Sequence, residues 1–338
     1  MDIDETDSAK AAMADLLSDS GPLVLSKFGD YAALIDARFP GLKEPVLALK
    51  VEEPGSKQLL AFQHDRIEDV CRDMIAHLVN DVVVVGARPL AVLDVVVCGS
   101  FDKKTVVRIV SALTKACRDQ ECNLVGGETS VQPGVLPGGR YILSAAAVGV
   151  VDRSEIIDQT RIRIGDSLLA LPSSGPHTNG FSLIRRLLEN QPSLADRRVA
   201  GQSFFDAVMA PHLCYYPALK GILRDPGIHG IAHVTGGGIS DNVERILSPE
   251  TDALIDLRSI RVPAVFSAIK EAAMVTDEEM LRVFNNGVGA VLAVPPERVP
   301  AVVSHLQAND VQPYVVGAVQ RGTGRVQFTG NVNWSTVV

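Results

Sequence analysis

Residues 166–190 read DSLLALPSSGPHTNGFSLIRRLLEN. The apolar run LLAL is typical of a buried strand, and the segment 180–190 is predicted as a helix. Between them lies a loop of hydroxyl, amide, glycine and imidazole groups. A strand, a polar loop and a helix in this order indicate an α/β domain with a polar junction suited to ligand binding.

The same alternation of strands and helices continues on both sides of this segment. Before it, we predict helices at 66–80 and 102–118 and strands at 45–51, 59–62, 89–98 and 141–151. The four valines at 82–85 continue the first helix, which closes at Gly86. After it, we predict helices at 213–223, 239–247, 263–273 and 296–307 and strands at 229–234, 252–256, 288–294 and 312–320. The sequence therefore predicts two mixed α/β domains, 1–155 and 164–338, joined by a polar link.

The composition is that of an ordinary globular protein. Of 338 residues, 46% are apolar and 21% are charged. The net charge of −8 makes nucleic acid a poor partner, because neutralising phosphates requires excess positive charge. The five cysteines include no CxxC pair, which favours a reducing compartment over disulfides or structural zinc. Apolar stretches are too short for a membrane span and the acidic N-terminus does not resemble a signal peptide, so we expect a cytoplasmic protein without membrane partners.

Two acidic residues are predicted in apolar surroundings. Asp81 comes late in a helix, within NDVVVVGARP, and Asp94 interrupts an apolar strand. A buried carboxylate is costly unless it is paired, hydrogen-bonded or bound to a metal. Helix capping with one satisfied core aspartate explains this pattern as well as metal binding does.

Glycine-rich stretches accompany several predicted strands. In LVGGET, residues 124–129, Glu128 projects from a strand end, although a plain turn is the simpler interpretation. The loop around His177 favours anion binding or proton transfer over a capped helix with a surface histidine. HVTGGGISDN, residues 233–242, offers backbone N–H groups to a phosphate, but glycines also join strands to helices for steric reasons. FNNGVG, residues 284–289, is locally a turn.

The segment KVEEPGSKQ, residues 50–58, is predicted locally as a solvent-exposed turn. Pro54 restricts φ and Gly55 tolerates positive φ, while the charged residues suit an exposed connection. The chain contains no GxxxxGK[ST], no GxGxxG after a strand and no HExxH. The commonest phosphate-loop, dinucleotide and zinc-protease motifs are thereby excluded.

In their order along the chain, these motifs resemble those of the phosphoribosylformylglycinamidine cyclo-ligases, also called aminoimidazole ribonucleotide synthetases. The family's D-x4-G-A-x-P, GGET and F-N-x-G-[VI]-G match residues 81–89, 126–129 and 284–289. Its GPHSNGYSL appears as GPHTNGFSL at residues 175–183, and its H-[LI]-TGGG-x-x-[ED]-N appears at residues 233–242 with Val234 at the second position. The likeness extends from about Glu44 to the C-terminus. The GPHxNG[YF]SL motif separates this family from related hydrogenase-maturation proteins and from selenophosphate and thiamine-phosphate kinases.

The resemblance implies two mixed α/β domains of the aminoimidazole ribonucleotide synthetase type. It also implies that the N-terminal domain binds ATP and pairs with the N-terminal domain of a second chain in a homodimer. It implies a ligase of purine biosynthesis that acts on a ribonucleotide. ATP, with Mg²⁺, phosphorylates the formyl amide oxygen of formylglycinamidine ribonucleotide, an amidine nitrogen attacks that carbon, and phosphate leaves. Such a transfer depends on positioning and on Mg²⁺ held by a few carboxylates.

The resemblance also implies roles for individual residues. Asp81, Glu128 and Glu52 correspond to Mg²⁺ ligands. Lys57 corresponds to a phosphate-contacting lysine, and His177 and Asn179 to residues of the phosphoryl-transfer step, with His177 as general acid or base. The residues implied to bind nucleotide or phosphate are Lys57, Asp81, Asp94, Gly126, Gly127, Glu128, Thr235, Gly236, Gly237, Gly238 and Asn242.

The sequence departs from the family chiefly at residues 51–57, where VEEPGSK replaces TDGVGTK. Glu52 replaces a shorter aspartate, and Glu53 and Pro54 replace glycine and valine. After GGET, Val131 replaces a second acid. These departures leave two alternatives open: a paralogue that activates a different amide with ATP, and a binding protein that kept the fold without turnover.

Overall fold

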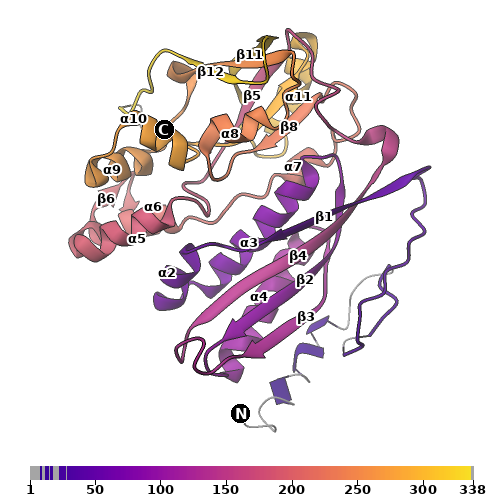
Figure 1. Ribbon diagram of the computed structural model, residues 1–338, viewed down its shortest axis with the longest axis vertical. Coiled ribbons are helices and arrows are strands. Elements are labelled where there is room, and N and C mark those ends of the chain that lie inside the picture. The colour runs from indigo at the N-terminus through magenta and orange to yellow at the C-terminus, as the bar shows by residue number, and fades with distance from the viewer. Residues whose placement is uncertain (1–7, 10–11, 15, 18–22, 28, 336–338) are drawn as a thin grey trace. The chain divides into compact units, whose positions relative to one another are not determined.

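A computed structural model describes residues 8–9, 12–14, 16–17, 23–27 and 29–335 (Figure 1). The chain divides into two compact units, one of residues 1–83 and 87–154 and one of residues 84–86 and 155–338. That the segments 1–155 and 164–338 each fold as an independent domain stays a prediction. Among the helices of the described residues, none combines the length and apolar character needed to cross a membrane.

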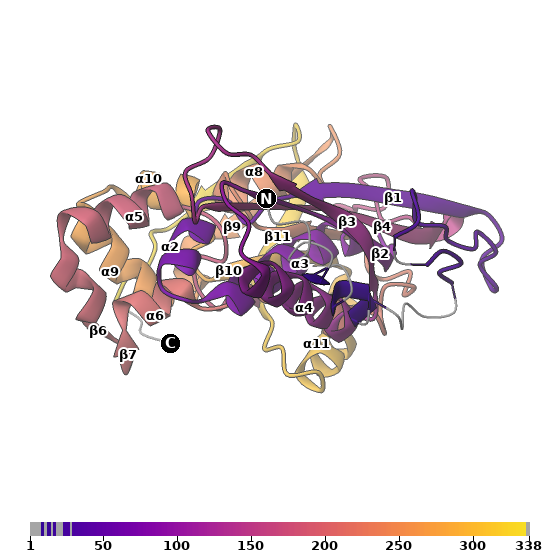
Figure 2. The same cartoon turned by 90° about the horizontal axis from the view of Figure 1, so that it is seen from below.

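The first unit is a four-stranded sheet with helices on one face. Its elements are β1 Pro45–Glu52, α2 Lys57–Gln63, α3 Ile67–Val83, β2 Arg88–Cys98, α4 Lys103–Asp119, β3 Asn123–Val131 and β4 Tyr141–Asp152. The strand order is β1-β4-β2-β3, with β2 and β3 parallel and the other pairs antiparallel. The parallel pair is connected through α4, since such a pair needs a crossover. Figure 2 shows α3 and α4 below the same face of the sheet.

The opposite face of this sheet is apolar. Leu49 and Val51 of β1 pair with Val148 and Ala146 of β4, and Leu93 of β2 pairs with Ala146 from the other side. Residues directly opposite one another on antiparallel strands project from the same face. Leu49 is 75% exposed and Val51 is 67% exposed. These residues form an exposed apolar patch on the sheet.

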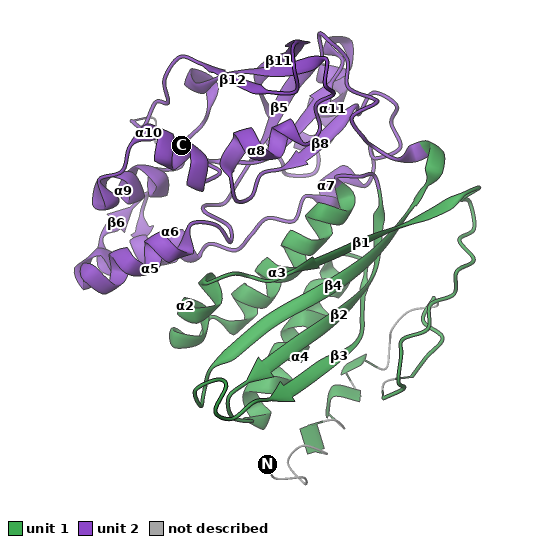
Figure 3. Ribbon diagram, viewed as in Figure 1, with its two compact units in different colours: residues 1–83, 87–154 green, residues 84–86, 155–338 purple. Residues whose placement is uncertain are grey.

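The second unit, purple in Figure 3, is built on a six-stranded sheet in the order β12-β9-β11-β5-β10-β8. Its strands are β5 Ser167–Pro172, β8 Gly230–His233, β9 Thr251–Asp256, β10 Val288–Val294, β11 Tyr314–Arg321 and β12 Val326–Thr329. Its helices are α5 Phe181–Asn190, α6 Phe204–Met209, α7 Tyr216–Leu219, α8 Gly238–Glu244, α9 Ala264–Ala273, α10 Asp277–Val283 and α11 Val299–Gln307. A two-stranded hairpin joins β6 Arg198–Val199 to β7 Gln202–Ser203. Both units are mixed α/β, as predicted.

Two of the predicted elements are wrong in type or length. Residues 59–62 belong to helix α2, not to a strand, and Lys57, Leu60 and Ala61 are buried along it at helical spacing. A short apolar run does not by itself distinguish a helix from a strand. Of the helix predicted at 213–223, only α7 is helical, and Pro217 lies in its first turn, the part of a helix that accommodates proline.

The GGET strand also differs from the prediction. β3 continues through Gly126 and Gly127 to Val131, so Glu128 lies within the strand and not at its end. The register between β2 and β3 shifts beside Gly126, and β3 is an edge strand, where such irregularities are tolerated. The predicted end of α3 is confirmed in part: Val82 and Val83 are helical, whereas Val84 and Val85 lie in the turn that closes at Gly86 with a φ of +85°.

Candidate functional site

Four titratable side chains meet where β1 leads into the 52–57 loop. Lys50 Nζ lies 3.1 Å from Glu52 Oε2 and 2.8 Å from Asp81 Oδ2. His77 Nε2 lies 3.5 Å and 3.7 Å from the same two carboxylate oxygens. Burial opposes the charge of Lys50, but the hydrogen bonds and charges of Asp81 and Glu52 outweigh it and raise the pKa of this lysine. Lys50 therefore stays protonated between two carboxylates.

The implied Mg²⁺ ligands are brought together only in part. Glu52 and Asp81 share Lys50, whereas Glu128 lies on β3. Within the described part of the chain, these three carboxylates do not form a group whose oxygens lie within 4.8 Å of one another. The structure thus places a pair of carboxylates, and not the full set of three, around one cation.

Lys57 lies in the core of the first unit. Its Nζ is 2.7 Å from Asp73 Oδ2 of α3, and neither side chain has any exposed surface. Burying two charges requires close pairing, and this ion pair joins α2 to α3. The structure therefore gives Lys57 a partner that the sequence did not suggest, and its contact with phosphate stays a prediction.

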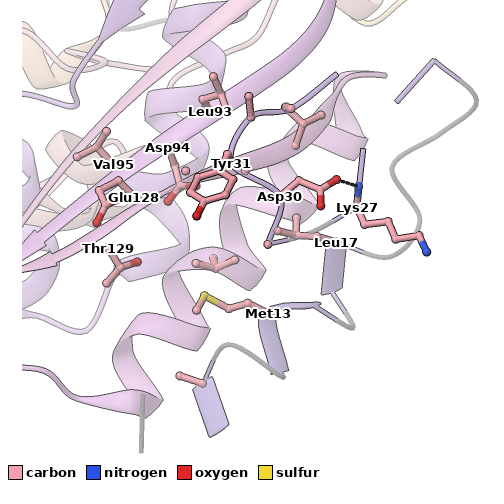
Figure 4. Close-up of a pocket in the computed structure, with 18 of the residues that line it drawn as sticks. Met13, Leu17, Lys27, Asp30, Tyr31, Leu93, Asp94, Val95, Glu128 and Thr129 are labelled. Carbon is pink, nitrogen blue, oxygen red and sulfur yellow. Dashed lines mark hydrogen bonds between the residues drawn. The ribbon is translucent and has the colours of Figure 1, made fainter. Parts of the chain in front are cut away.

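Four of the implied nucleotide-binding residues line one cavity. Asp94, Gly126, Gly127 and Glu128 surround a space of about 960 Å³, which Tyr31 also lines (Figure 4). This volume is in the range of small-molecule sites. A Cβ on Gly126 would come no closer than 3.5 Å to Leu93 Cδ2, so this glycine leaves the backbone of β3 accessible at the wall.

The Asp94 side chain has room in this wall because its neighbour on β3 is a glycine. Asp94 pairs with Gly127 across β2 and β3, and a Cβ on Gly127 would come within 2.2 Å of Asp94 Oδ1. Burial raises the pKa of Asp94 to about 7, against a weaker opposing effect of its backbone hydrogen bond. A substantial fraction of Asp94 is therefore protonated at neutral pH.

The raised pKa of Asp94 predicts a pH-dependent stability. The folded state binds the proton of the Asp94 carboxyl more tightly than the unfolded state does. The contribution of this proton to the free energy of unfolding is therefore complete below about pH 4 and is lost as pH rises through about 7. Asparagine does not ionise. We therefore expect the free energy of unfolding of Asp94→Asn, relative to that of wild type, to be on the order of 2–3 kcal/mol higher at pH 8 than at pH 5. Urea unfolding at both pH values measures this, with the exposed Asp196→Asn as control. Equal differences at the two pH values would contradict it.

In the second unit, His177 and Asn179 lie in the loop between β5 and α5. His177 is fully buried and has a φ of +58°, and the Ser174 amide contacts its Nε2 at 3.4 Å. Asn179 faces the TGGG loop, because a Cβ on Gly236 would lie 3.5 Å from Asn179 Oδ1. Two motifs that are far apart in the sequence are therefore adjacent.

The TGGG loop is shaped from within by Asn242. Asn242 Nδ2 donates to the carbonyl oxygens of Gly236 and Gly238 at 3.1 Å and 2.8 Å, and Thr235 Oγ1 donates to Asn242 Oδ1 at 3.2 Å. Gly238 also packs closely, since a Cβ there would come within 1.9 Å of the Leu281 carbonyl oxygen. Asn242 thus positions the loop. Phosphate binding by Thr235, Gly236, Gly237 and Gly238 stays a prediction.

Asn285, in the segment predicted locally as a turn, links a further loop to this region. Ser173 Oγ donates to Asn285 Oδ1, and Asn285 Nδ2 donates to the Gly175 carbonyl oxygen, both at 2.9 Å. Asn285 is fully buried. The FNNGVG turn therefore fixes the start of the His177 loop. The available sequence signal was the pair of asparagines before a glycine in FNNG.

Family models match both halves of the chain. The model described as AIR synthase related protein, N-terminal domain, matches residues 29–151, and the one described as the C-terminal domain matches residues 163–328. The chain belongs to the AIR synthase-related family. It is 37% identical over 305 residues to a phosphoribosylformylglycinamidine cyclo-ligase of Cupriavidus pinatubonensis, covering 90% of this chain and 87% of that protein. The predicted family is confirmed, and with it an enzyme of the ATP-using kind.

Solved structures share the fold at low sequence identity. Thiamine-monophosphate kinase from Stenotrophomonas maltophilia aligns with a TM-score of 0.68 and 18% identity over 97% of this chain and 96% of that one. A hydrogenase maturation protein, HypE, in complex with ATP aligns with a TM-score of 0.65 and 18% identity over 93% and 90%. These two likenesses show a common two-domain α/β fold.

Proposed function

We propose that this enzyme closes the imidazole ring of aminoimidazole ribonucleotide, a step of purine biosynthesis, from formylglycinamidine ribonucleotide and ATP. The observation that carries the proposal is the 37% identity, over 90% of the chain, to a protein named for this ring closure. The GPHTNGFSL and HVTGGG motifs, which lie in adjacent loops, support it.

In the proposed reaction the formyl amide oxygen attacks the γ-phosphorus of ATP, and ADP leaves. An amidine nitrogen then attacks the activated carbon. The carbon–oxygen bond breaks, the oxygen departs within inorganic phosphate, and the nitrogen loses a proton. We assign the proton transfer to His177, because imidazole exchanges protons near neutral pH.

The nucleotide is proposed to bind the first unit. Glu52 and Asp81 fit a cation, since the Lys50 ammonium already lies within 3.1 Å of an oxygen of each. Mg²⁺ is held in such sites by one or two carboxylates together with phosphate oxygens. When bound, it would neutralise charge on the transferred phosphoryl group. Asp94, Gly126, Gly127 and Glu128 are proposed to contact the nucleotide from the cavity wall.

The ribonucleotide is proposed to bind the loops of the second unit. Asn179 and His177 would contact the reacting amide. The backbone of Thr235–Gly238, which Asn242 shapes, would bind the ribose phosphate. The adjacency of Asn179 and Gly236 supports one substrate spanning both loops.

Two first units are proposed to pair through their apolar sheet faces. Leu49 and Val51 are mostly exposed in the single chain, and burying such residues drives association. A second copy of the chain supplies a matching surface, because a twofold axis places the same patch on both partners.

For the homodimer, we expect Leu49→Lys to weaken association by more than about 30-fold, as loss of an interface hot spot does. Sedimentation velocity over a concentration series measures the dissociation constant. Met274→Lys, which changes a 90%-exposed side chain of the second unit, is the matched control. A wild-type protein that sediments as a monomer, or a Leu49→Lys protein as dimeric as wild type, would contradict the proposed interface.

A cytoplasmic location is also proposed. All five cysteines are free thiols, and four of them are buried. Free thiols are usual in a reducing compartment.

The function is tested by incubating the purified protein with Mg-ATP and formylglycinamidine ribonucleotide. We expect ADP release that depends on the ribonucleotide, together with formation of the aminoimidazole. ATP binding without turnover of this substrate would overturn the assignment in favour of a paralogue that activates another amide. A protein that binds no ATP would favour the non-catalytic alternative.

A further inference from the structure

Three histidines from separate segments meet in the core of the second unit. His177 lies in the loop after β5, His212 precedes α7, and His233 ends β8. Their exposed fractions are 0%, 2% and 5%. One ring nitrogen of each lies within 4.8 Å of the other two. His212 was not singled out from the sequence, and the proposed reaction does not use it.

His212 and His233 bring two ring nitrogens to a distance close to that between two ligands of one metal ion. Their Nε2 atoms are 3.0 Å apart and face each other, and their ring centroids are 5.1 Å apart at an interplanar angle of 43°. Two nitrogens on one tetrahedral Zn²⁺ lie about 3.4 Å apart, since each Zn–N bond is about 2.0–2.1 Å. Without a metal, one ring must donate a proton to the other.

His177 is the third histidine of the cluster and lies against His212. Its ring stacks on that of His212 with centroids 3.9 Å apart and an interplanar angle of 18°. This is closer than two rings stand on one tetrahedral ion, so ligation by all three requires the His177 ring to turn. The Ser174 amide contacts His177 Nε2 at 3.4 Å, at the long limit of hydrogen bonding.

The surrounding structure fixes the other parts of the cluster. His233 is paired with Ala290 in the sheet. Tyr215, three residues after His212, donates to the Pro172 carbonyl oxygen at 2.8 Å. A Cβ on Gly289 would come within 1.7 Å of Tyr215 Oη and 3.0 Å of His177 Cε1, so this glycine makes room for both side chains. His212 and His233 are therefore supported by their surroundings, and the reorganisation that an ion requires falls on the His177 ring.

We propose that His177, His212 and His233 bind one divalent transition-metal ion of the Zn²⁺ class, with a fourth position open to water or an oxygen ligand. Imidazole nitrogens suit Zn²⁺, Co²⁺ and Ni²⁺, whereas Mg²⁺ prefers oxygen. The site is therefore chemically distinct from the Glu52–Asp81 pair. The binding does not depend on the proposed ring closure, but an ion on His177 would withdraw that imidazole from proton transfer and inhibit any reaction that needs it.

The test is a Co²⁺ titration of untagged, chelator-treated, full-length protein in excess Mg²⁺, followed by its visible d–d absorption. We expect one Co²⁺ per chain with the spectrum of a four-coordinate ion, displaced by Zn²⁺. His212→Gln is expected to weaken binding by more than about 100-fold, because losing a ligand costs at least as much as losing a supporting residue. His64→Gln, at an exposed position after α2, is the control and should bind like wild type.

Thermal unfolding of the metal-free proteins shows whether each variant is folded, and His177→Gln repeats the test from another loop. Absence of stoichiometric Co²⁺ uptake by the wild type would overturn the proposal whatever the variants do. Wild-type affinity in folded His212→Gln would overturn it as well. A folded variant that has lost the absorption, beside an unchanged His64→Gln protein, would support it.

Discussion

Replacing Lys57 by alanine is expected to lower the free energy of unfolding by about 3–5 kcal/mol, the cost of leaving one partner of a buried ion pair uncompensated. Lys57 Nζ is 2.7 Å from Asp73 Oδ2 and both side chains are fully buried. The alanine variant leaves the Asp73 carboxylate in the core without its cation. Urea unfolding at neutral pH measures the loss. From the motif alone, the same substitution is expected to remove turnover and leave the fold intact; the burial changes that expectation.

Two controls distinguish the effect of breaking the buried Lys57–Asp73 pair from the effect of removing a charged side chain elsewhere. Lys115 forms an exposed pair with Asp119 at 2.6 Å, and Lys115→Ala is expected to cost less than about 1 kcal/mol. The double variant Lys57→Met, Asp73→Leu removes both charges and should recover most of the stability lost by Lys57→Ala. If Lys57→Ala cost no more than Lys115→Ala, the pair would not be the structural link between α2 and α3.

Replacing Asp81 by asparagine is expected to lower kcat by a factor on the order of 10²–10³, as loss of one electrostatic group in an active site does. The change removes a carboxylate from the proposed Mg²⁺ pair and keeps its size. Asp81 is partly exposed and its neighbour Lys50 retains Glu52, so the free energy of unfolding should change by less than about 1 kcal/mol. Steady-state ADP formation at saturating substrates measures the rate.

Glu53→Gln is the matched control for Asp81→Asn. Glu53 is exposed, lies in the loop that follows β1, and also carries one negative charge. We expect its kcat to stay within about twofold of wild type, because exposed charges contribute little. An Asp81→Asn enzyme with a wild-type rate would remove Asp81 from the site, and an equal loss in both variants would point to net charge instead of a ligand role.

Much of the fold could be predicted from periodicity alone. The strand at 288–294 agrees with β10 residue for residue, because VGAVLAV is buried throughout and bounded by turn residues. α10 was missed although Thr276 and Glu279 form a capping box, which is a readable signal. Residues 59–62 were predicted wrongly because a short apolar run does not distinguish a helix from a strand. The contact of Lys57 with Asp73, which joins α2 to α3, is not visible in any local pattern.

Residues of the candidate site could be predicted where they belong to one sequence motif. Contacts between residues of different segments could not. The motifs indicated His177 and the TGGG loop, and the structure shows them adjacent through Asn179 and Gly236. The partner of Lys57, the bridging role of Lys50 and the approach of His212 to His233 depend on tertiary packing. In KVEEPGSKQ, Lys50 contacts both Glu52 and Asp81, whereas Lys57 is buried against Asp73 and its contact with phosphate stays a prediction.

The central claim, that the formyl amide oxygen is phosphorylated before the ring closes, is tested most directly by isotope transfer. Formylglycinamidine ribonucleotide labelled with ¹⁸O in the formyl group is turned over with unlabelled Mg-ATP, and the released phosphate is analysed by mass spectrometry. We predict one ¹⁸O atom in each phosphate formed together with the aminoimidazole. Unlabelled phosphate from a reaction that still produces the aminoimidazole, with the label released to water, would contradict the account.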